Sequence, residues 1–234
     1  MMDGYFITGT DTDIGKTWTS LGIVEALKRR GHTVGVMKPV SAGCAQTGAG
    51  LRNEDALLLQ RHSNVELAYD QINPYAFAPA IAPHIAAAEA AMRMDIETLH
   101  AQFQAIAAQS DCVVVEGAGG WQVPLNDFQT MAELAKRLAL PVCLVVGLRL
   151  GCLNHALLTV ASIRASGLPL AGWVANQLTP EMARLDENIA TLERMIEAPL
   201  LGRIPYLEHL DVNAIADRLS LPPARNTLRP DWAI

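Results

Sequence analysis

The sequence predicts a doubly wound α/β fold, in which helices cover both faces of a mostly parallel sheet. Three observations lead to this prediction. Short runs such as residues 112–115 and 142–146 are apolar at every position, which indicates strands buried on both faces. These runs alternate with longer amphipathic stretches, which implies helical crossovers between parallel strands. Glycine and polar residues gather directly after the runs, where ligands bind in such sheets.

The expected elements follow in chain order. Strands are expected at residues 5–8, 33–37, 112–115, 142–146, 171–175 and 200–204. Helices are expected at 16–30, from 54, at 95–109, at 130–138, from about 153 to 167, and from 179, and residues 39–53 are expected to be a loop. Four signals support the helix bounds: Gly31 after the first helix, Asp95 as an N-cap, a capping box starting at Thr130, and Pro180 at a first helical position.

Length and composition indicate one domain. The chain has 234 residues, half of them hydrophobic, without an internal repeat or a low-complexity linker. We therefore expect a single domain over residues 1–234, in which the tail after about residue 207 has no assigned role. The net charge of −6 argues against non-specific nucleic-acid binding, because such binding needs a basic face.

Cysteine spacing and hydropathy predict a cytoplasmic protein without membrane association. The four cysteines are Cys44, Cys112, Cys143 and Cys152, and no two of them have the C-x-x-C spacing of zinc or redox motifs. A reducing compartment is the simplest setting for them. The N-terminus does not resemble a signal peptide. The longest apolar stretch, 141–153, is broken by Arg149 and is shorter than the roughly 20 residues that span a membrane.

A phosphate-binding loop lies between the first expected strand and the first expected helix. The segment Gly9–Thr17 ends in Gly-Lys-Thr, as in a P-loop, but has five residues between Gly9 and Gly15 where the usual motif has four. Backbone N–H groups and the helix N-terminus would hold phosphate oxygens. Lys16 would reach the terminal phosphates, and the Thr17 hydroxyl would take a magnesium position. The loop predicts a P-loop NTPase-like fold and an enzyme that uses ATP and Mg²⁺.

Three charged residues lie near this loop in the expected topology. Glu116 ends a strand and precedes the glycine-rich segment 117–120, which is where a magnesium-binding carboxylate would lie. Asp55 stands near a helix start. It either binds magnesium or only stabilises the helix, because a negative charge near the N-terminus interacts favourably with the helix dipole. Lys38 follows a strand and precedes Pro39, which fixes the chain direction. From these residues alone, Lys38 either faces a phosphate or an anionic intermediate, or is an ordinary solvated lysine.

Six segments in order resemble the dethiobiotin synthetase family, from about Tyr5 to Leu207. They are Gly9–Thr17, Lys38-Pro39-Val40, Asn53-Glu54-Asp55-Ala56-Leu57, Val115-Glu116-Gly117-Ala118-Gly119-Gly120-Trp121, Gly151-Cys152-Leu153-Asn154-His155-Ala156 and Ala171-Gly172-Trp173-Val174-Ala175-Asn176. The resemblance implies a ligase of biotin biosynthesis that uses 7,8-diaminononanoate, CO2, ATP and Mg²⁺. One amine becomes a carbamate, ATP phosphorylates it to a mixed anhydride, and the second amine closes the ring, releasing ADP and phosphate.

The resemblance also implies site residues. Lys16 and Lys38 would be catalytic, because fixed positive charge must bring an anionic carbamate and an anionic phosphate together. The ATP-binding residues would be Thr12, Asp13, Ile14, Gly15, Lys16, Thr17, Trp18, Asp55, Glu116, Gly117, Ala118, Gly119, Asn176, Gln177, Pro205, Tyr206 and Leu207. Magnesium would bind Thr17, Asp55 and Glu116. The substrate would bind Lys38, Ser41, Leu150, Gly151 and Asn154, and the last three would act across a homodimer interface.

One position departs from the family pattern. Ser or Thr commonly stands immediately before the glycine after Lys-Pro-Val, whereas this chain has Ala42 before Gly43 and a serine one residue earlier. In an extended chain this shift turns the hydroxyl of Ser41 to the opposite side. Ser41 is kept as a candidate substrate ligand because the segment is expected to be a loop, in which the hydroxyl need not turn to the opposite side. His155 is better explained as a structural histidine than as an acid or base.

Three other protein classes share parts of the pattern. A ParA/MinD-like ATPase switch would carry a second lysine near the loop start, where this chain has Thr10, Asp11 and Thr12. A GTP-dependent metallochaperone would need Asn-Lys-x-Asp to bind guanine, which the segment 176–179 does not match. A cobyrinate-type amide synthetase would append a glutaminase domain, for which the chain has no room.

Overall fold

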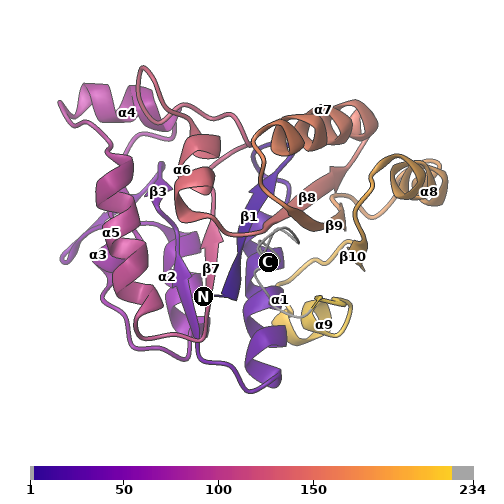
Figure 1. Cartoon of the computed structure of the whole chain (residues 1–234), viewed down its shortest axis with the longest axis horizontal. Helices are drawn as coiled ribbons and strands as arrows, with labels where there is room; N and C mark the ends of the chain where they lie inside the picture. The colour runs from indigo at the N-terminus through magenta and orange to yellow at the C-terminus, as the bar shows by residue number, and fades with distance from the viewer. Residues whose placement is uncertain (1–2, 223–234) are drawn as a thin grey trace, which may run out of the picture.

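The computed structural model describes residues 3–222, which form an α/β sandwich around one six-stranded parallel sheet (Figure 1). The strand order is β10-β9-β8-β1-β7-β2, and every neighbouring pair is parallel. The strands are β1 (Asp3–Gly9), β2 (Val34–Met37), β7 (Cys112–Glu116), β8 (Val142–Leu148), β9 (Leu170–Gln177) and β10 (Leu200–Ile204). The predicted fold class is confirmed.

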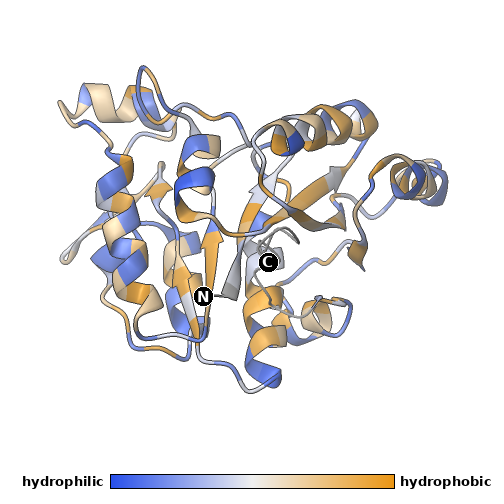
Figure 2. Cartoon of the chain, viewed as in Figure 1, coloured by the Kyte–Doolittle hydropathy of each residue, from blue (hydrophilic) through white to orange (hydrophobic). Residues whose placement is uncertain are grey.

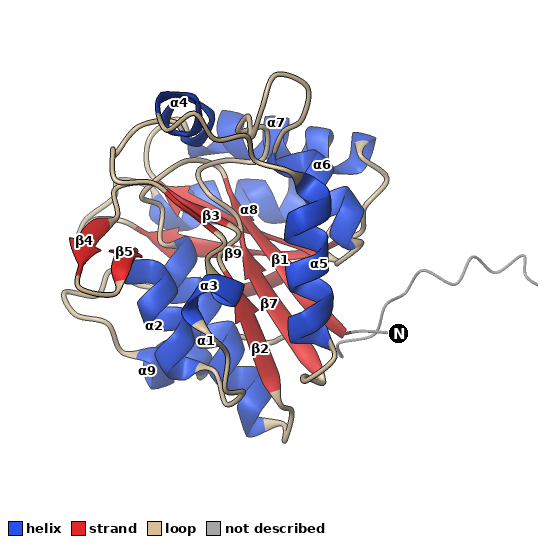
Figure 3. Ribbon diagram, turned by 90° about the vertical axis from the view of Figure 1, so that its left-hand side faces the viewer, coloured by secondary structure: helices blue, strands red, loops and turns tan. Residues whose placement is uncertain are grey.

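Helices cover both faces of the sheet (Figure 3). One face carries α1 (Lys16–Arg29), α2 (Glu54–His62) and α9 (Val212–Ala216). The opposite face carries α5 (Ile96–Ala107), α6 (Met131–Leu138) and α7 (Cys152–Ala165), with α8 (Leu185–Met195) packed beside α7. The sheet lies between two helical layers, so its central strands form the core (Figure 2). Every residue of β7 and β8 is buried, which explains why these strands are apolar throughout.

Of the three predicted helix starts that rest on a local sequence signal, two are confirmed and one is wrong. The Asp95 carboxylate accepts the Thr98 N–H at the start of α5, and Thr130 and Glu133 form a capping box at α6. The helix expected from residue 179 begins at Leu185 instead. Residues 179–180 lie in a turn, because the Gln177 amide donates to both of their carbonyls, at 2.8 and 3.0 Å.

The stretch after β2 is more ordered than the expected loop. It contains β3 (Val40–Ser41), which pairs with β6 (Tyr75–Ala76), and a small hairpin of β4 (Ala45–Thr47) and β5 (Gly50–Arg52). Two short helices, α3 (Tyr69–Ile72) and α4 (Pro83–Glu89), follow α2. Elements of two to seven residues are too short to show a period in the sequence. Together they extend the fold beyond the carboxyl edge of the sheet.

The segment after residue 207 contributes to the fold. Helix α9 packs on α1, and the Arg29 guanidinium bonds the Asp217 carboxylate at 2.6 Å. The contact is close at Gly22, where an added Cβ would lie 2.3 Å from Cγ2 of Ile215. The rest of the predicted tail, residues 223–234, lies outside the described residues. Within residues 3–222, no helix combines the length and apolarity needed to cross a membrane, and all four cysteines are buried.

Candidate active site

The phosphate loop leaves the carboxyl end of β1 and opens directly into α1. Gly15 is the N-cap of α1, has φ +84°, and supplies no side-chain cap, so the first N–H groups of the helix stay available to an anion. The Asn176 amide donates to the Ile14 carbonyl at 2.8 Å and lies directly against Gly15. The end of β9 therefore holds the loop from outside and leaves no room for a side chain at Gly15.

Lys16 lies within the phosphate loop and is 7% exposed. Its Nζ donates to the Asp11 carbonyl at 2.7 Å, so the ammonium lies across the loop that precedes it. Burial lowers the pKa of Lys16 to about 8, with a further lowering from Lys38, while Glu116 and Asp55 oppose the change. A phosphate bound in the loop would supply the anionic partner that this buried cation lacks.

ATP affinity in the absence of divalent metal is expected to weaken as the pH rises through about 8. Below that pH Lys16 is charged, whereas above it phosphate binding must recruit a proton, so Kd rises by up to about tenfold per pH unit. Calorimetry in two buffers of different ionisation enthalpy measures both Kd and proton uptake. Lys16→Arg keeps its charge and should abolish the uptake. A wild-type Kd that is flat between about pH 7 and 9 contradicts this assignment.

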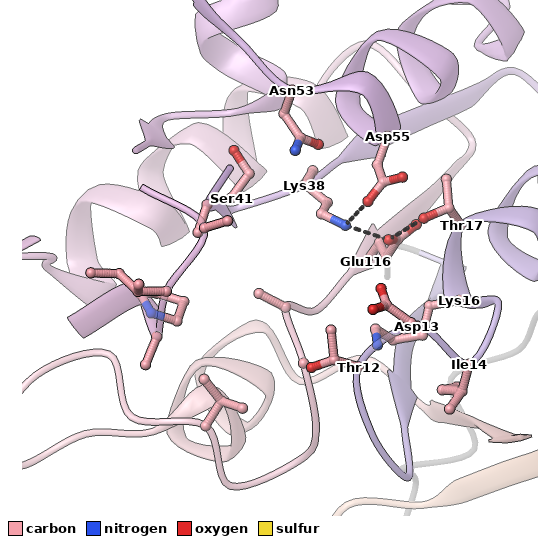
Figure 4. Close-up of a pocket in the computed structure, with 18 of the residues that line it drawn as sticks. Thr12, Asp13, Ile14, Lys16, Thr17, Lys38, Ser41, Asn53, Asp55 and Glu116 are labelled. Atoms are coloured by element: carbon pink, nitrogen blue, oxygen red, sulfur yellow. Dashed lines mark hydrogen bonds and ion pairs between the residues drawn. The ribbon is translucent and has the colours of Figure 1, made fainter. Parts of the chain in front are cut away.

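An ion-pair cluster of Lys38, Asp55 and Glu116 lies opposite the loop (Figure 4), with Lys38 and Glu116 buried and Asp55 partly exposed. Lys38 follows β2, Asp55 lies in the first turn of α2, and Glu116 ends β7. The Lys38 Nζ donates to Asp55 Oδ2 at 2.8 Å and to Glu116 Oε1 at 2.5 Å. Lys38 is 6% and Glu116 is 0% exposed. The solvated alternative for Lys38 is therefore wrong, and its ammonium is held at one position.

Lys38 and Asp55 keep their charges at neutral pH. Burial alone would lower the pKa of Lys38, but the carboxylates of Glu116 and Asp55 outweigh it and raise the pKa to about 12. Burial would likewise raise the pKa of Asp55, but the Lys38 ammonium outweighs it and the pKa is lowered. An ammonium and a carboxylate thus face the phosphate loop together.

The oxygen atoms around Thr17 fit a magnesium ion. The Thr17 hydroxyl donates to Glu116 Oε1 at 2.9 Å, and the buried Glu116 Oε2 has no hydrogen-bond partner among the described residues. Asp55 adds a second carboxylate at the same place. Within the described chain no three His, Cys, Asp or Glu side chains gather into a metal cage. One or two carboxylates, a hydroxyl and substrate phosphates are the set that Mg²⁺ uses.

A cavity of about 830 Å³ joins the phosphate loop to the ion-pair cluster. It is lined by Thr12, Asp13, Ile14, Gly15, Lys16, Thr17, Trp18, Lys38, Ser41, Ala42, Asn53, Asp55, Ala80, Ile81, Ala82, Pro83, Glu116, Ala118, Gly119, Val123 and Pro124. Sequence reasoning missed Asn53, which it would have recognised only as a helix cap, and the two apolar segments 80–83 and 123–124, which carry no motif. These segments make the far wall of the cavity apolar.

A second, smaller cavity of about 180 Å³ lies beside the loop. Its lining contains Asp13, Gly15, Trp18, Asn176, Gln177, Leu178, Pro205, Tyr206 and Leu207. The five predicted ATP-binding residues at the end of β9 and after β10 all line it, together with Leu178, which the sequence did not suggest. Gly117 is the one predicted ATP-binding residue that lines neither cavity. It lies against Met131 and the Ile7 carbonyl instead.

The predicted substrate residues divide into two groups. Ser41 lines the large cavity with Lys38, but its hydroxyl donates to Asn73 Oδ1 at 2.7 Å and lies 3.1 Å from the Cys44 sulfur. Leu150, Gly151 and Asn154 lie at the start of α7, are exposed, and line neither cavity. The neighbouring Arg149 forms an ion pair with Asp11 of the phosphate loop. The loop before α7 is thus tied to the phosphate loop but does not face the cavity of its own chain.

Comparison with solved structures identifies the fold. The MinC:MinD cell division protein complex of Aquifex aeolicus and a ParA family ATPase of Chlorobium tepidum TLS superpose with TM-scores of 0.58 and 0.54. The matches cover 92% and 89% of this chain and 86% of each of those chains. Identity is 14% in both cases, so the similarity is one of fold alone.

Comparison with curated proteins identifies the family. A family model described as an AAA domain matches residues 3–214. The ATP-dependent dethiobiotin synthetase BioD of Pseudomonas aeruginosa (strain UCBPP-PA14) is 52% identical over 95% of this chain and 98% of its own length. The protein of the same name from Cellvibrio japonicus (strain Ueda107) is 51% identical over 94% and 96%. With half of its residues identical to theirs along nearly its whole length, the chain belongs to the family of ATP-dependent dethiobiotin synthetases.

Proposed function

We propose that the protein closes the ureido ring of dethiobiotin from 7,8-diaminononanoate and CO2 at the expense of ATP, in biotin biosynthesis. The observation that carries the proposal is the buried Lys38 ammonium. It is fixed between Asp55 and Glu116, and it faces the phosphate loop across a cavity large enough for a nucleotide phosphate and a second substrate. Membership of the synthetase family supports the same assignment.

The proposed reaction has three steps. One amine of the substrate attacks CO2 and loses a proton, which gives a carbamate. A carbamate oxygen attacks the terminal phosphorus of ATP, the bond to ADP breaks, and a carbamic-phosphoric anhydride forms. The second amine then attacks the carbamate carbon, loses a proton, and expels phosphate as the ring closes. Two anions meet in the second step, so its barrier depends on fixed positive charge.

Lys16 and Lys38 supply that charge from opposite sides of the cavity. Lys16 binds the terminal phosphates from within the phosphate loop. Lys38 holds the carbamate, because its ammonium lies at the cavity wall and its pKa keeps it protonated. Thr17, Asp55 and Glu116 would hold Mg²⁺, which when bound neutralises phosphate oxygens. The apolar wall formed by residues 80–83 and 123–124 suits the aliphatic chain of the diamino acid.

We also propose that the active form is a homodimer. Leu150 is fully exposed, and with Gly151 and Asn154 it projects from the start of α7 outside the cavity of its own chain. In a dimer these residues would close the substrate site of the neighbouring subunit. Light scattering under assay conditions measures the state directly. A monomer that retains full diamine-dependent turnover would contradict the proposal of a substrate site shared between two subunits.

ADP release with and without the diamine tests the proposed function. With Mg-ATP and bicarbonate, 7,8-diaminononanoate is expected to stimulate ADP release and to yield one dethiobiotin per ADP, measured by a coupled assay and by mass spectrometry. A monoamine of the same length is the control, because it can form a carbamate but cannot close the ring. ATP turnover that ignores the diamine would contradict the proposal and favour an ATPase switch, which shares this fold.

A further inference from the structure

A buried polar network behind the cavity joins the two segments that carry Lys38 and Asp55. We propose that Asn73 and Tyr69 are positioning residues, which set the Lys38 ammonium and the Asp55 carboxylate relative to the phosphate loop. Neither residue lines the cavity, so both would act only through the residues they hold. The inference rests on the proposed function, because its effect on rate is measured with the diamine. Its effect on ATP binding is measured without the diamine.

Asn73 holds the segment that follows β2. Its amide is 3% exposed, and its Nδ2 donates to the Lys38 carbonyl at 2.7 Å. Because a carbonyl can only accept, this contact fixes which end of the amide faces Lys38. Oδ1 accepts from the Ser41 hydroxyl at 2.7 Å and from the Tyr69 hydroxyl at 3.0 Å. A second, longer bond from Nδ2 reaches the Tyr75 carbonyl at 3.5 Å, so the amide uses its full bonding capacity.

Tyr69 carries the network to the metal side of the site. Its hydroxyl donates to Asn73 and accepts the backbone N–H of Asn53 at 2.7 Å. Asn53 is the N-cap of α2, and its side chain accepts the Ala56 N–H. Asp55 lies in the turn that this cap starts, two residues after Asn53. The Arg52 guanidinium covers the Tyr69 ring, 4.1 Å from its centre, and adds a further constraint.

Apart from each other, the Asn73 amide and the Tyr69 hydroxyl therefore bond four groups. These are the Lys38 and Tyr75 carbonyls, the Ser41 hydroxyl and the Asn53 N–H. Buried polar groups are usually bonded, so a satisfied network alone indicates only a well-built interior. Here the bonded groups are the backbone of Lys38 and the backbone at the start of α2, and these two segments lie on either side of the ion-pair cluster. A shift of about 1 Å in a positioned group can cost roughly 100-fold in rate, so loosening this network should slow the chemistry.

The test uses Asn73→Asp and Tyr69→Phe, with Tyr75→Phe as the matched control. Asp keeps the shape of Asn but places a carboxylate oxygen against the Lys38 carbonyl. The Tyr75 hydroxyl also accepts the N–H of a helix N-cap residue, Asp95, at 3.1 Å, but at the start of α5. Tyr75 takes part in the network through its backbone carbonyl alone, which the substitution keeps. Both removed hydroxyls thus accept the N–H of a helix N-cap residue, but only that of Tyr69 also donates, to Asn73.

The expected result is a fall in diamine-dependent kcat of about 100-fold for Asn73→Asp and about tenfold for Tyr69→Phe, with Tyr75→Phe within about twofold of the wild type. The Kd and stoichiometry of ATP binding without metal should stay within about twofold, because the phosphate loop is not part of the network. A merely structural role would instead lower the stoichiometry, as molecules unfold. The gain in ATP affinity on adding Mg²⁺ should shrink in both network variants, since Asp55 moves.

Two outcomes overturn the inference. If Tyr69→Phe has the same kcat as Tyr75→Phe and the same gain in ATP affinity on adding Mg²⁺, the network stabilises the interior and does not position the site. The same conclusion follows if rates fall in step with the fraction of protein that binds nucleotide. Should Asn73→Asp fail to fold, Tyr69→Phe still decides, because it removes one oxygen atom only. If the diamine does not change ATP turnover by the wild type, the proposed function fails on its own. The gain in ATP affinity on adding Mg²⁺ then still tests the network.

Discussion

Replacing Lys38 with methionine is expected to reduce diamine-dependent turnover about 10³-fold while leaving metal-free ATP binding nearly unchanged. The ammonium is the fixed cation opposite the phosphate loop, whereas the loop itself and Lys16 stay intact. Steady-state rates and calorimetry with ATP measure the two quantities. Lys136→Met is the control, because the same substitution falls on an exposed position of α6. Equal rates in the two variants would remove Lys38 from the mechanism.

The same substitution is expected to destabilise the fold, which corrects a purely catalytic view of Lys38. Without the ammonium, the fully buried Glu116 loses its charged partner, and breaking a buried pair in this way costs about 3–5 kcal/mol. Adding Glu116→Gln removes the stranded charge, so the double variant should regain stability without regaining turnover. Denaturant unfolding measures the difference. A double variant no more stable than Lys38→Met would contradict this account.

The sign of the pH dependence follows from the raised pKa of Lys38. A group whose pKa is higher in the folded state stabilises that state fully below its unfolded value of 10.5 and loses this contribution as the pH rises through about 12. The stability difference between wild type and Lys38→Met should therefore be constant from neutral pH to about 10.

Gly15→Ala is expected to weaken ATP binding at least about 100-fold, and Gly31→Ala is expected to leave it unchanged. Both glycines are left-handed and lie at the two ends of α1, with φ +84° and +87°, so both substitutions carry the same backbone cost of roughly 1 kcal/mol. A Cβ at Gly15 would lie 2.1 Å from Nδ2 of Asn176, whereas no described heavy atom lies within 4 Å of one at Gly31. Only Gly15→Ala must therefore displace the loop.

Equilibrium binding of ATP and thermal unfolding separate these effects. Both variants should lose a similar amount of stability from backbone strain, and Gly15→Ala should lose affinity in addition. Asn176→Ala in the Gly15→Ala background removes the clashing amide, and is expected to recover thermal stability but not ATP affinity, because Asn176 is itself a predicted ATP-binding residue. If Gly15→Ala binds ATP as Gly31→Ala does, the Asn176 contact does not shape the loop.

The strand-end residues could be predicted from the sequence because one topological rule covers them. Parallel strands bring their carboxyl ends to a single edge, so Lys38, Glu116 and Asn176 had to meet the loop after β1. The apolar runs identified the strands, and the rule then placed residues that are up to 167 positions apart, from Gly9 to Asn176, beside one another. No pairwise contact had to be guessed.

What the sequence could not provide was the direction of individual side chains. Ser41 stands in the cavity wall as expected, but the partner of its hydroxyl, Asn73, directly follows a four-residue helix with no visible period. The start of α8 was misplaced for a similar reason. Pro180 is compatible with a first helical turn and with a tight turn, and the Gln177 amide decides between them.

The contact of α9 with α1 has a consequence for the order of events during synthesis. The phosphate loop and its helix are made before most of the domain, yet α1 is covered by Val212–Ala216, made nearly two hundred residues later. Domains fold as their chain emerges, N-terminal parts first. The nascent chain therefore carries an uncovered face of α1 until α9 has been made.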